Sequence, residues 1–370
     1  MATTIIQTPA IPYVQVPETS ANLDWADLRT LDLSKFDLPG GKQDLAAELA
    51  KAIEDVRFFY VKNYGLSKEE GDAQFGLAKS VLSLPNEEKQ RYRAELEQGD
   101  YNGWKPAGIR TLIPGVKDDF EIYNISKFIL EHARRALEVV REHWQSIQQF
   151  SRHIHEHIVK KLIVIFAVAL GLEDDEWLVT RHRYDRASGD HLRYMKYYAR
   201  SEKENQKLGG VWLKGHSHMG SLTLLFRQPV AALQVLTKNG QWKYVRPQVE
   251  ALTTNIADAL QFMTNGYLKS STHRVAAPPK NQAHIDRLGV LYMVRIEDDR
   301  DLVPIDESPV LQKHCLAGNK ILGSDSRPLK AGEWVKQRVV KNLGESTAKE
   351  GDNEVNDVEI LKGVKDAAGS

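Results

Sequence analysis

Two histidines stand one residue apart in the segment KGHSHMGSLTLLFRQ, which runs from Lys214 to Gln228. Residues two apart in a β-strand point to the same face, so His216 and His218 would project together into one site. A third imidazole is available from His273 in STHRVAAP, which follows the strand-like segment QFMTNGYLKS. Three imidazoles on two strands can bind one face of an ion and leave its other positions open, as catalysis requires. The spacing therefore predicts a metal site made by these three histidines.

A second group of histidines lies in SRHIHEHIVKK, at His153, His155 and His157. On a helix, His153 and His157 share a face at a spacing of four residues, and His155 points away from it. The zinc-protease signature needs the order His-Glu-x-x-His, whereas here a glutamate stands directly between His155 and His157. We therefore predict a solvated helix face, with adventitious zinc or nickel binding as the alternative.

The composition is that of an ordinary globular protein. Of the 370 residues, 50 are Lys or Arg and 50 are Asp or Glu, so the formal net charge is zero. This balance argues against nucleic acid or an anionic membrane as the main partner. The single cysteine, Cys315, permits no intrachain disulfide and fits a reducing, cytoplasmic compartment. The amino-terminal residues do not resemble a secretory signal, and the most apolar segment, Leu162–Leu172, is too short to cross a bilayer and is expected to be a buried helix.

Helical and mixed sequence comes first along the chain, and strand-like sequence follows. Apolar spacing predicts helices over 44–56 and 67–82, with a buried strand over 57–65 between them. The segment 128–171 is predicted to form two helices. From 192 to 310, short β-branched and aromatic runs are separated by Gly, Asn and Pro, which is typical of a β-sandwich or barrel.

This order of elements predicts an α+β fold. We expect four parts: an amino-terminal region over 1–125, a helical segment over 126–190, a β-rich core with the three histidines over 191–315, and a C-terminal part over 316–370. Within the last part, AGEWVKQRVVKNL predicts a helix, and the tail from Gly344 is expected to be disordered.

The motifs around the three histidines resemble those of a known enzyme family. GHSHMGSLTLLFRQ, ALQVLTKNGQWKYVRP, LTTNIADALQFMTNGYLKSSTHRV and RLGVLYMV are similar to consecutive motifs of the non-haem iron(II), 2-oxoglutarate-dependent dioxygenases. The subgroup is that of isopenicillin N synthase and the plant flavonoid and hormone oxygenases. DLAAELAKAIEDVRFFYVKNYGLS and LPNEEK resemble the amino-terminal half of that subgroup. The resemblance covers about residues 10–315 and implies a double-stranded β-helix, or jelly roll, with the metal at the open mouth of the barrel.

By this resemblance, His216 and His273 are the two iron-binding histidines. Tyr198 matches a tyrosine that contacts the carboxylate of the cosubstrate, although Ala199 replaces the proline that usually follows it. Arg287 matches the arginine that pairs with the distal carboxylate of 2-oxoglutarate, a role that suits the planar guanidinium fork.

Two positions depart from the family pattern. His218 stands where the family has its metal-binding aspartate, and Gly289 stands where it has the serine of Arg-x-Ser. An imidazole lacks the negative charge of a carboxylate and suits copper and zinc as well as iron. The missing serine hydroxyl removes a charge-assisted hydrogen bond, worth about 1.5–3 kcal/mol, from the carboxylate clamp.

The resemblance implies a non-haem, metal-dependent oxygenase that hydroxylates, desaturates or rearranges a small metabolite, as members of this subgroup often do in specialised metabolism. It would use Fe(II), molecular oxygen and 2-oxoglutarate. Two alternatives stay open: a metalloenzyme on the same fold that holds copper or iron and does not use 2-oxoglutarate, and a non-catalytic metal-binding homologue. Candidates to line the substrate site are Tyr101, Trp104, Arg110 and Tyr292, for each of which packing is the alternative role.

Overall fold

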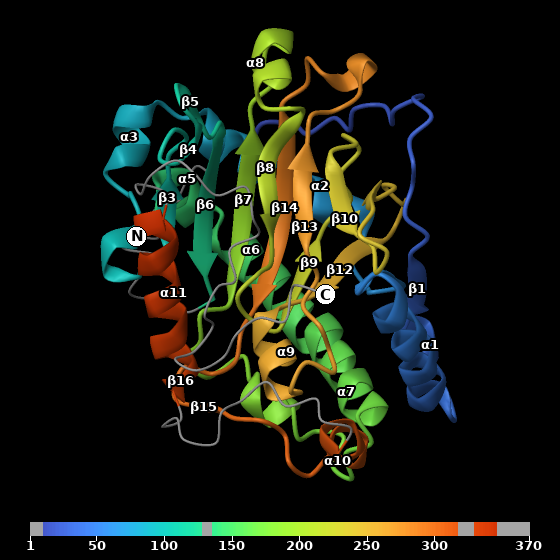
Figure 1. Ribbon diagram of the computed structural model, residues 1–370. Coiled ribbons are helices and arrows are strands. Elements are labelled where there is room, and N and C mark those ends of the chain that lie inside the picture. The colour runs from blue at the N-terminus through green and yellow to red at the C-terminus, as the bar shows by residue number, and fades with distance from the viewer. Residues whose placement is uncertain (1–9, 128–134, 317–328, 346–370) are drawn as a thin grey trace.

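Two β-sheets facing each other form the centre of the molecule (Figure 1). The computed structural model describes residues 10–127, 135–316 and 329–345. The larger sheet has the strand order β1-β2-β12-β9-β14-β7-β6-β3, and the smaller has the order β11-β10-β13-β8. From β7 onward the chain alternates between the two sheets, except that β10 and β11 are neighbours in the smaller one. This winding is a double-stranded β-helix and confirms the predicted jelly-roll core of an α+β fold.

The larger sheet is antiparallel except where β1 pairs with β2. Its strands are β1 (Arg29–Asp32), β2 (Phe58–Lys62), β3 (Gly103–Lys105), β6 (Phe120–Ser126), β7 (His191–Tyr197), β9 (Leu222–Leu225), β12 (Leu252–Ile256) and β14 (Arg287–Val294). The smaller sheet consists of β8 (Val211–His216), β10 (Leu233–Leu236), β11 (Trp242–Tyr244) and β13 (His273–Ala276). A short hairpin joins β4 (Thr111–Ile113) to β5 (Val116–Lys117), and β15 (Asp301–Leu302) forms a separate antiparallel pair with β16 (Leu329–Lys330).

One strand-like segment is not a strand. The prediction for QFMTNGYLKS was wrong, because its first residues belong to the helix α9 (Asp258–Met263). The apolar side chains of Leu260 and Met263 are buried in the core from this helix. Asn265 and Gly266 then adopt positive φ values of 49° and 79°, and this turn ends the helical segment before the chain enters β13.

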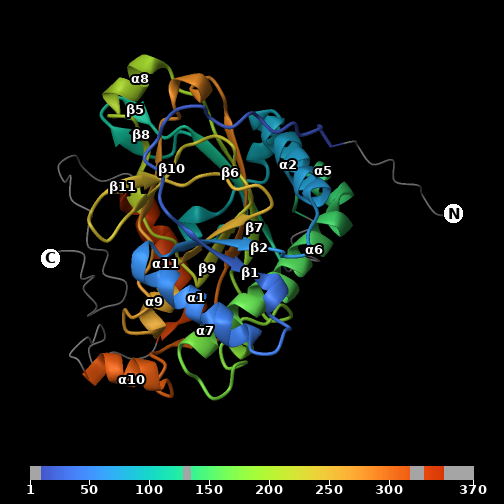
Figure 2. The same cartoon turned by 90° about the vertical axis from the view of Figure 1, so that its right-hand side faces the viewer.

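The helices lie outside the barrel, and α2, α5 and α6 follow one side of it in Figure 2. The longer ones are α1 (Gly41–Asp55), α2 (Lys68–Ser83), α6 (Trp144–His153), α7 (Lys160–Ala169), α10 (Pro309–Leu316) and α11 (Ala331–Glu345). The shorter ones are α3 (Asn86–Gln90), α5 (Glu138–Glu142), α8 (Glu202–Lys207) and α9, with 3₁₀ turns η1 (Leu33–Lys35), η2 (Leu96–Gln98), η4 (Val179–Arg181) and η5 (Lys280–Gln282). A π-helical turn, η3 (Ile154–Val159), joins α6 to α7.

Most of the helix predictions are confirmed. α1 and α2 occupy the two predicted amino-terminal helices, and a capping box between Ser67 and Glu70 fixes the start of α2. The predicted C-terminal helix is α11. Residues 128–134 of the predicted two-helix segment and most of the tail that we expected to be disordered, 346–370, lie outside the described residues.

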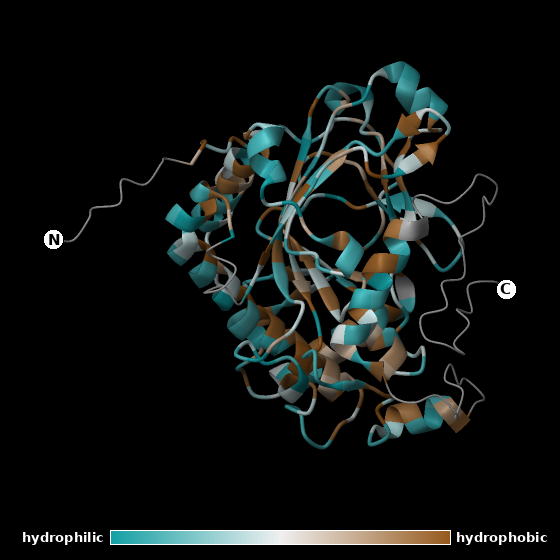
Figure 3. Ribbon diagram, turned by 90° about the vertical axis from the view of Figure 1, so that its left-hand side faces the viewer, coloured by the Kyte–Doolittle hydropathy of each residue, from teal (hydrophilic) through white to brown (hydrophobic). Residues whose placement is uncertain are grey.

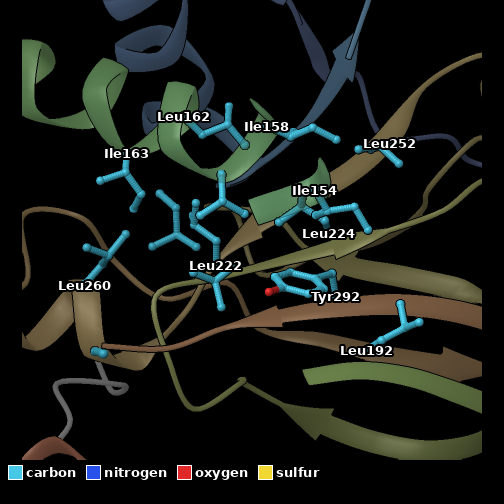
Figure 4. Close-up of a cluster of buried hydrophobic side chains, with 14 of the residues drawn as sticks. Ile154, Ile158, Leu162, Ile163, Leu192, Leu222, Leu224, Leu252, Leu260 and Tyr292 are labelled. Atoms are coloured by element: carbon cyan, nitrogen blue, oxygen red, sulfur yellow. The ribbon is translucent and has the colours of Figure 1, made fainter. Parts of the chain in front are cut away.

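The main hydrophobic core lies between the helices and the outer face of the larger sheet (Figures 3 and 4). Ile154, Ile158 and Leu162 from η3 and α7 pack with Leu222 and Tyr292 from the sheet. The apolar segment that begins at Leu162 is therefore a buried helix, as predicted. None of the helices in the described ranges is long and apolar enough to cross a membrane.

Strands from the amino-terminal region extend both edges of the larger sheet, β1 and β2 beyond β12, and β3 and β6 beyond β7. The same sheet thus includes residues from 1–125 and from 191–315. The division of the chain into the four expected parts stays a prediction.

Candidate metal centre

The structure brings His216, His218 and His273 together inside the barrel. His216 is the last residue of β8 and pairs directly with His273, the first residue of β13. Their ring centroids lie 4.3 Å apart, and that of His218 lies 4.4 Å from His273 and 5.4 Å from His216. Among the residues that the structure describes, these three form the one group of His, Cys, Asp or Glu side chains arranged to hold a metal ion.

We expected His216 and His218 to lie on one strand. This expectation was wrong, because β8 ends at His216 and His218 lies in the loop that follows. Beyond this point the chain turns toward α9, where the carbonyl oxygen of His218 accepts from the Asp258 amide at 2.9 Å. Gly220 has a φ of 112° in this loop, and a Cβ there would lie 2.4 Å from the carbonyl oxygen of Val294. The loop therefore requires glycine at this position, and its conformation places His218 beside the other two rings.

Two of the histidines have their tautomer fixed by the backbone. His216 Nδ1 lies 3.0 Å from the carbonyl oxygen of Lys214, and His273 Nδ1 lies 3.1 Å from that of Ser271. A carbonyl oxygen only accepts, so both Nδ1 atoms carry the proton and both Nε2 atoms present a lone pair. This is the arrangement in which an imidazole binds a metal through Nε2.

The third histidine contacts both a hydroxyl and another ring. His218 Nδ1 lies 2.8 Å from Thr223 Oγ1, and its Nε2 lies 3.1 Å from His273 Nε2. Without a metal, His218 can donate its Nε2 proton to His273 and accept from Thr223. To bind a metal through Nε2, His218 would carry its proton on Nδ1 and donate it to the Thr223 hydroxyl, so that the Nε2 lone pairs of all three histidines would be available to the ion. The donor set therefore fits a divalent metal.

Burial and nearby arginines keep the imidazoles neutral. Burial, with the charges of Arg110 and Arg193, lowers the pKa of His216 to about 4. Burial also holds the pKa of His218 and that of His273 well below the usual value. Neutral imidazole is the form that binds metals, so these rings are ready to ligate at neutral pH.

A buried ion pair supports the loop from behind. The carboxylate of Asp258 accepts from Ser217, the residue between His216 and His218, and from Arg338 on α11 at 3.0 Å. Arg338 and Asp258 are 7% and 2% exposed. The C-terminal helix thus contacts the loop that carries His218 through one carboxylate.

Arg287 also faces the interior of the barrel. It pairs across the sheet with Tyr197, whose ring packs with Trp212 from the smaller sheet. Its guanidinium is buried, and in the described part of the chain its Nε has no hydrogen-bond acceptor. A buried, unpaired guanidinium is suited to bind a carboxylate. Gly289 follows on the same face, where a Cβ would meet only Leu291 Cδ1 at 3.5 Å and Met195 O at 3.9 Å.

Tyr198, predicted to contact the cosubstrate, lies on the opposite face. Its hydroxyl donates to Glu121, and Lys196 lies over its ring. Successive residues of a strand alternate between faces, so Tyr197 points toward Arg287 and Tyr198 points away from the histidines. The structure therefore does not bring Tyr198 to the site.

Of the four residues predicted to line the substrate site, two lie away from the histidines and two lie on the inner side of the barrel. Trp104 donates to Glu121 at 2.7 Å, and Tyr292 lies in the helix-covered core beside His155. Tyr101 and Arg110 lie on the inner side, where Tyr101 stacks on His191 and the charge of Arg110 reaches His216.

The sequence interpretation missed three inward-facing residues, Thr223, Arg193 and Arg295. Strand alternation carried the signal for the two arginines, because Arg193 is four residues from Tyr197 and Arg295 is eight from Arg287. No sequence pattern distinguished Thr223, which lies five residues beyond His218.

In the described part of the chain, the other histidine group does not bring three ligands together. His157 is exposed and His153 is half-buried, which agrees with the predicted solvated face, but His155 is buried. The His155 Nε2 donates to the carbonyl oxygen of His182, and its Nδ1 accepts from the hydroxyl of Tyr292. His155 is therefore part of the core.

Two family models match the chain. Residues 181–293 match the 2OG-Fe(II) oxygenase superfamily, and residues 28–146 match the family described as non-haem dioxygenase in morphine synthesis N-terminal. The first range contains the three histidines and Arg287.

Similar sequences cover most of the chain. A UPF0676 protein of Schizosaccharomyces pombe is 28% identical over 331 residues, which cover 87% of this chain and 94% of the relative. A 2-oxoglutarate-dependent dioxygenase of Gibberella zeae is 28% identical over 299 residues, covering 78% and 87%. Scopoletin 8-hydroxylase of Arabidopsis thaliana is 27% identical over 274 residues, covering 71% of each chain.

Solved structures share the fold. A full-length Neurospora crassa protein in complex with alpha-KG and thymine superimposes with a TM-score of 0.73 at 20% identity, covering 87% of this chain and 99% of that one. The dioxygenase for auxin oxidation in rice superimposes with a TM-score of 0.61 at 17% identity, covering 85% and 96%.

Proposed function

Because the chain belongs to the 2OG-Fe(II) oxygenase superfamily, it is an oxidoreductase that uses Fe(II) and 2-oxoglutarate, and we propose that it oxidises a small organic molecule at a site formed by His216, His218 and His273. The observation that carries this assignment of the site is the convergence of the three rings, two with their Nδ1 protons held by backbone carbonyls. The chemistry that Fe(II) supplies when bound is the activation of molecular oxygen coupled to the decarboxylation of 2-oxoglutarate.

Arg287 binds the distal carboxylate of 2-oxoglutarate in this proposal. Arg287 is 5% exposed, and its guanidinium has no acidic partner within the described ranges. Tyr197 lies opposite it and takes the place that we had assigned to Tyr198. Its ring centroid lies 5.7 Å from the guanidinium carbon, close enough to orient the fork and to exclude water from one side.

The histidine in place of a carboxylate makes the interior more positive. A metal ion held by three neutral imidazoles keeps its full charge, and the nearby arginines add to it. Such an interior favours anionic ligands, so 2-oxoglutarate binds even without the serine hydroxyl that Gly289 lacks. The substrates that accompany it are molecular oxygen and an organic metabolite of the kind handled in specialised metabolism.

The location and partners follow from composition. We place the enzyme in the cytoplasm, acting on a small molecule and not on nucleic acid or a membrane surface. The balanced charge of 50 basic and 50 acidic residues and the single cysteine support this placement.

The direct test measures metal content and succinate. Protein purified without a chelator or a histidine tag is loaded with Fe(II), and oxygen uptake and succinate are followed with and without 2-oxoglutarate. We expect succinate only when both are present, and at least a hundredfold less from the His273→Ala variant. His157→Ala, which changes an exposed histidine of the outer helix, is the matched control and keeps full activity.

Two results would contradict the proposal. Metal-dependent oxygen uptake that is indifferent to 2-oxoglutarate would support the alternative metalloenzyme, and failure to bind any metal under all loading conditions would support a non-catalytic protein. Arg287→Gln tests the cosubstrate site separately. The loss of about 1.5–3 kcal/mol of charge-assisted bonding raises the KM for 2-oxoglutarate roughly ten- to a hundredfold.

A further inference from the structure

The inner face of β7 and β14 carries more positive charge than one carboxylate of 2-oxoglutarate requires. Besides Arg287, the side chains of Arg193 and Arg295 also face the interior. Arg193 lies opposite Leu291 in the register of the two strands, four residues from Arg287. Four residues of a strand span about 13 Å, so the two backbone positions are well separated along the barrel.

These two additional arginines have only neutral partners. Arg193 donates from Nε to Asn124 Oδ1 at 2.8 Å and from NH2 to His191 Nε2 at 3.2 Å. Arg295 is 3% exposed, and its Nε has no acceptor anywhere in the described structure. Within residues 10–127, 135–316 and 329–345, no carboxylate forms an ion pair with either guanidinium.

One of the two acids whose charges act on Arg295 already has other hydrogen-bond partners. Asp190 accepts from Lys127 Nζ at 2.7 Å, from Ser188 Oγ at 2.7 Å and from the backbone amide of Arg295 at 2.5 Å. Burial lowers the pKa of Arg295 despite the opposing charges of Asp190 and Asp298. A guanidinium out of contact with water that forms no ion pair is costly to bury, and a bound anion would reduce that cost.

An aromatic ring joins the two arginines. The guanidinium carbons of Arg193 and Arg295 lie 5.8 Å and 5.6 Å from the ring centroid of Tyr101, which stacks on His191. A planar platform beside two guanidinium groups suits an anionic group attached to an apolar body.

The two positions also differ in their relation to the histidines. Thr223, whose hydroxyl contacts His218, lies opposite Met293 in the register of β9 and β14, two residues from Arg295. His218 therefore lies at the end of β14 that is next to Arg295.

We propose that the substrate is an organic acid whose carboxylate binds between Arg193 and Arg295, beside Tyr101, while 2-oxoglutarate occupies Arg287. This inference rests on the proposed function, because it names the class of molecule that the same site would oxidise. The carboxylate is held on the His218 side of the trio and fixes which carbon of the substrate faces the metal.

Binding is tested with matched acids and amides. Octanoate, 3-phenylpropionate and indole-3-acetate, each with its amide, are titrated calorimetrically into anaerobic enzyme loaded with Fe(II) and saturating 2-oxoglutarate. We expect at least one acid to bind tenfold or more tightly than its amide, and Arg295→Met and Arg193→Gln to abolish that preference. Arg152→Gln, an exposed arginine on the outer helix, is the control and keeps it.

The melting temperature of the substrate-free protein is a second test of the role of Arg295, and it needs no ligand. Replacing an uncompensated buried charge by an apolar side chain of similar length is neutral or stabilising, whereas removal of a structural ion pair is destabilising. The substrate-free Arg295→Met protein should therefore melt at the same temperature as the unchanged protein or higher. A lower melting temperature would assign Arg295 a structural role and overturn the proposal.

The remaining outcomes are equally decisive. No preference for any acid over its amide, or the same preference in the Arg295→Met variant, would refute the carboxylate site. Inorganic phosphate that binds with the same dependence on Arg193 would show a site for free anions instead. Succinate formation in the same preparation tests the proposed function separately. The absence of a preference for acids would therefore leave the proposed function standing, and the absence of succinate would not by itself refute the carboxylate site.

Discussion

The Nε2 atoms of His218 and His273 lie 3.1 Å apart, although the two residues come from a loop and a strand 55 positions distant in sequence. Two neighbouring ligands of one ion, each bonded at about 2.1 Å, are separated by roughly this distance. Phe58 packs edge-on against His273 and holds the ring in place. The pair is therefore preorganised for a shared ion.

Aspartate at position 218 should strengthen the iron site. A carboxylate adds negative charge and is a harder ligand, which favours Fe(II) over copper or zinc. For His218→Asp we expect tighter Fe(II) binding and faster 2-oxoglutarate-dependent succinate formation, measured by metal titration and product analysis. His218→Asn, which adds no charge, serves as the control and should weaken both. Loss of activity in the aspartate variant would show that the reaction needs the imidazole itself.

Thr223 should matter for the metal because its hydroxyl can accept the Nδ1 proton of His218 when His218 is in the ligating tautomer. The residue is 1% exposed and its hydroxyl has His218 Nδ1 as partner. Removing an outer-shell partner of this kind typically lowers metal affinity ten- to a hundredfold. We expect that loss for Thr223→Val and its recovery in Thr223→Ser, read from the visible spectrum of Co(II) during a competition titration. Equal affinity in the valine variant would mean that Thr223 has no such role.

A serine at position 289 should improve cosubstrate binding. A Cβ at Gly289 makes only ordinary contacts, so the backbone there accepts a residue with a Cβ. The added hydroxyl can donate to the carboxylate that Arg287 binds, and we expect the KM for 2-oxoglutarate to fall about tenfold with little change in kcat. Gly289→Ala fills the same space without a donor and should leave KM unchanged. A similar fall in the alanine variant would attribute the gain to backbone stiffening.

Acid should destabilise the fold through a buried histidine far from the metal. Burial lowers the pKa of His182 to about 4, and its Nδ1 donates to the carbonyl oxygen of Leu178 while its Nε2 accepts from Ser221. The unfolded chain, with an ordinary pKa of about 6.5, binds the proton first as pH falls. Stability is thus complete above pH 6.5 and declines toward pH 4, by up to roughly 3 kcal/mol.

Urea unfolding of the metal-free protein at pH 7 and pH 5 measures this decline. His182→Asn keeps a donor near Nδ1 and removes the titrating ring, so the difference between the two pH values should shrink. An unchanged difference would place the acid sensitivity in other groups.

The barrel could be predicted from sequence because its strands are short, apolar and separated by turn residues. The runs at Leu192, Leu222, Leu233, Leu252 and Val290 all became strands. Periodicity also found α1, α2 and α11. It failed at 261–270, where an apolar run serves a short helix, because four or five apolar residues fit either element.

The site was predicted less completely, for a geometric reason. Spacing predicted the three histidines that lie together, and the resemblance predicted Arg287, which faces the interior. The resemblance also indicated Tyr198, whereas Tyr197 is the residue that faces inward, because a shift of one residue reverses the face of a strand. The conformation of the loop after His216 depends on contacts with α9, which are remote in sequence. Arg193 could be assigned to the inner face only when Tyr197, and not Tyr198, was found to point inward, whereas Arg295 shares the face of Arg287 by strand alternation.

The contact between Arg338 and Asp258 gives the C-terminal helix a consequence beyond packing. Proteolytic trimming or an alternative chain end ahead of α11 would remove the guanidinium that binds the Asp258 carboxylate, and the loop that carries His218 would lose this support. Fragments that retain the whole barrel but lack this helix would lose the metal long before they lose their sheets.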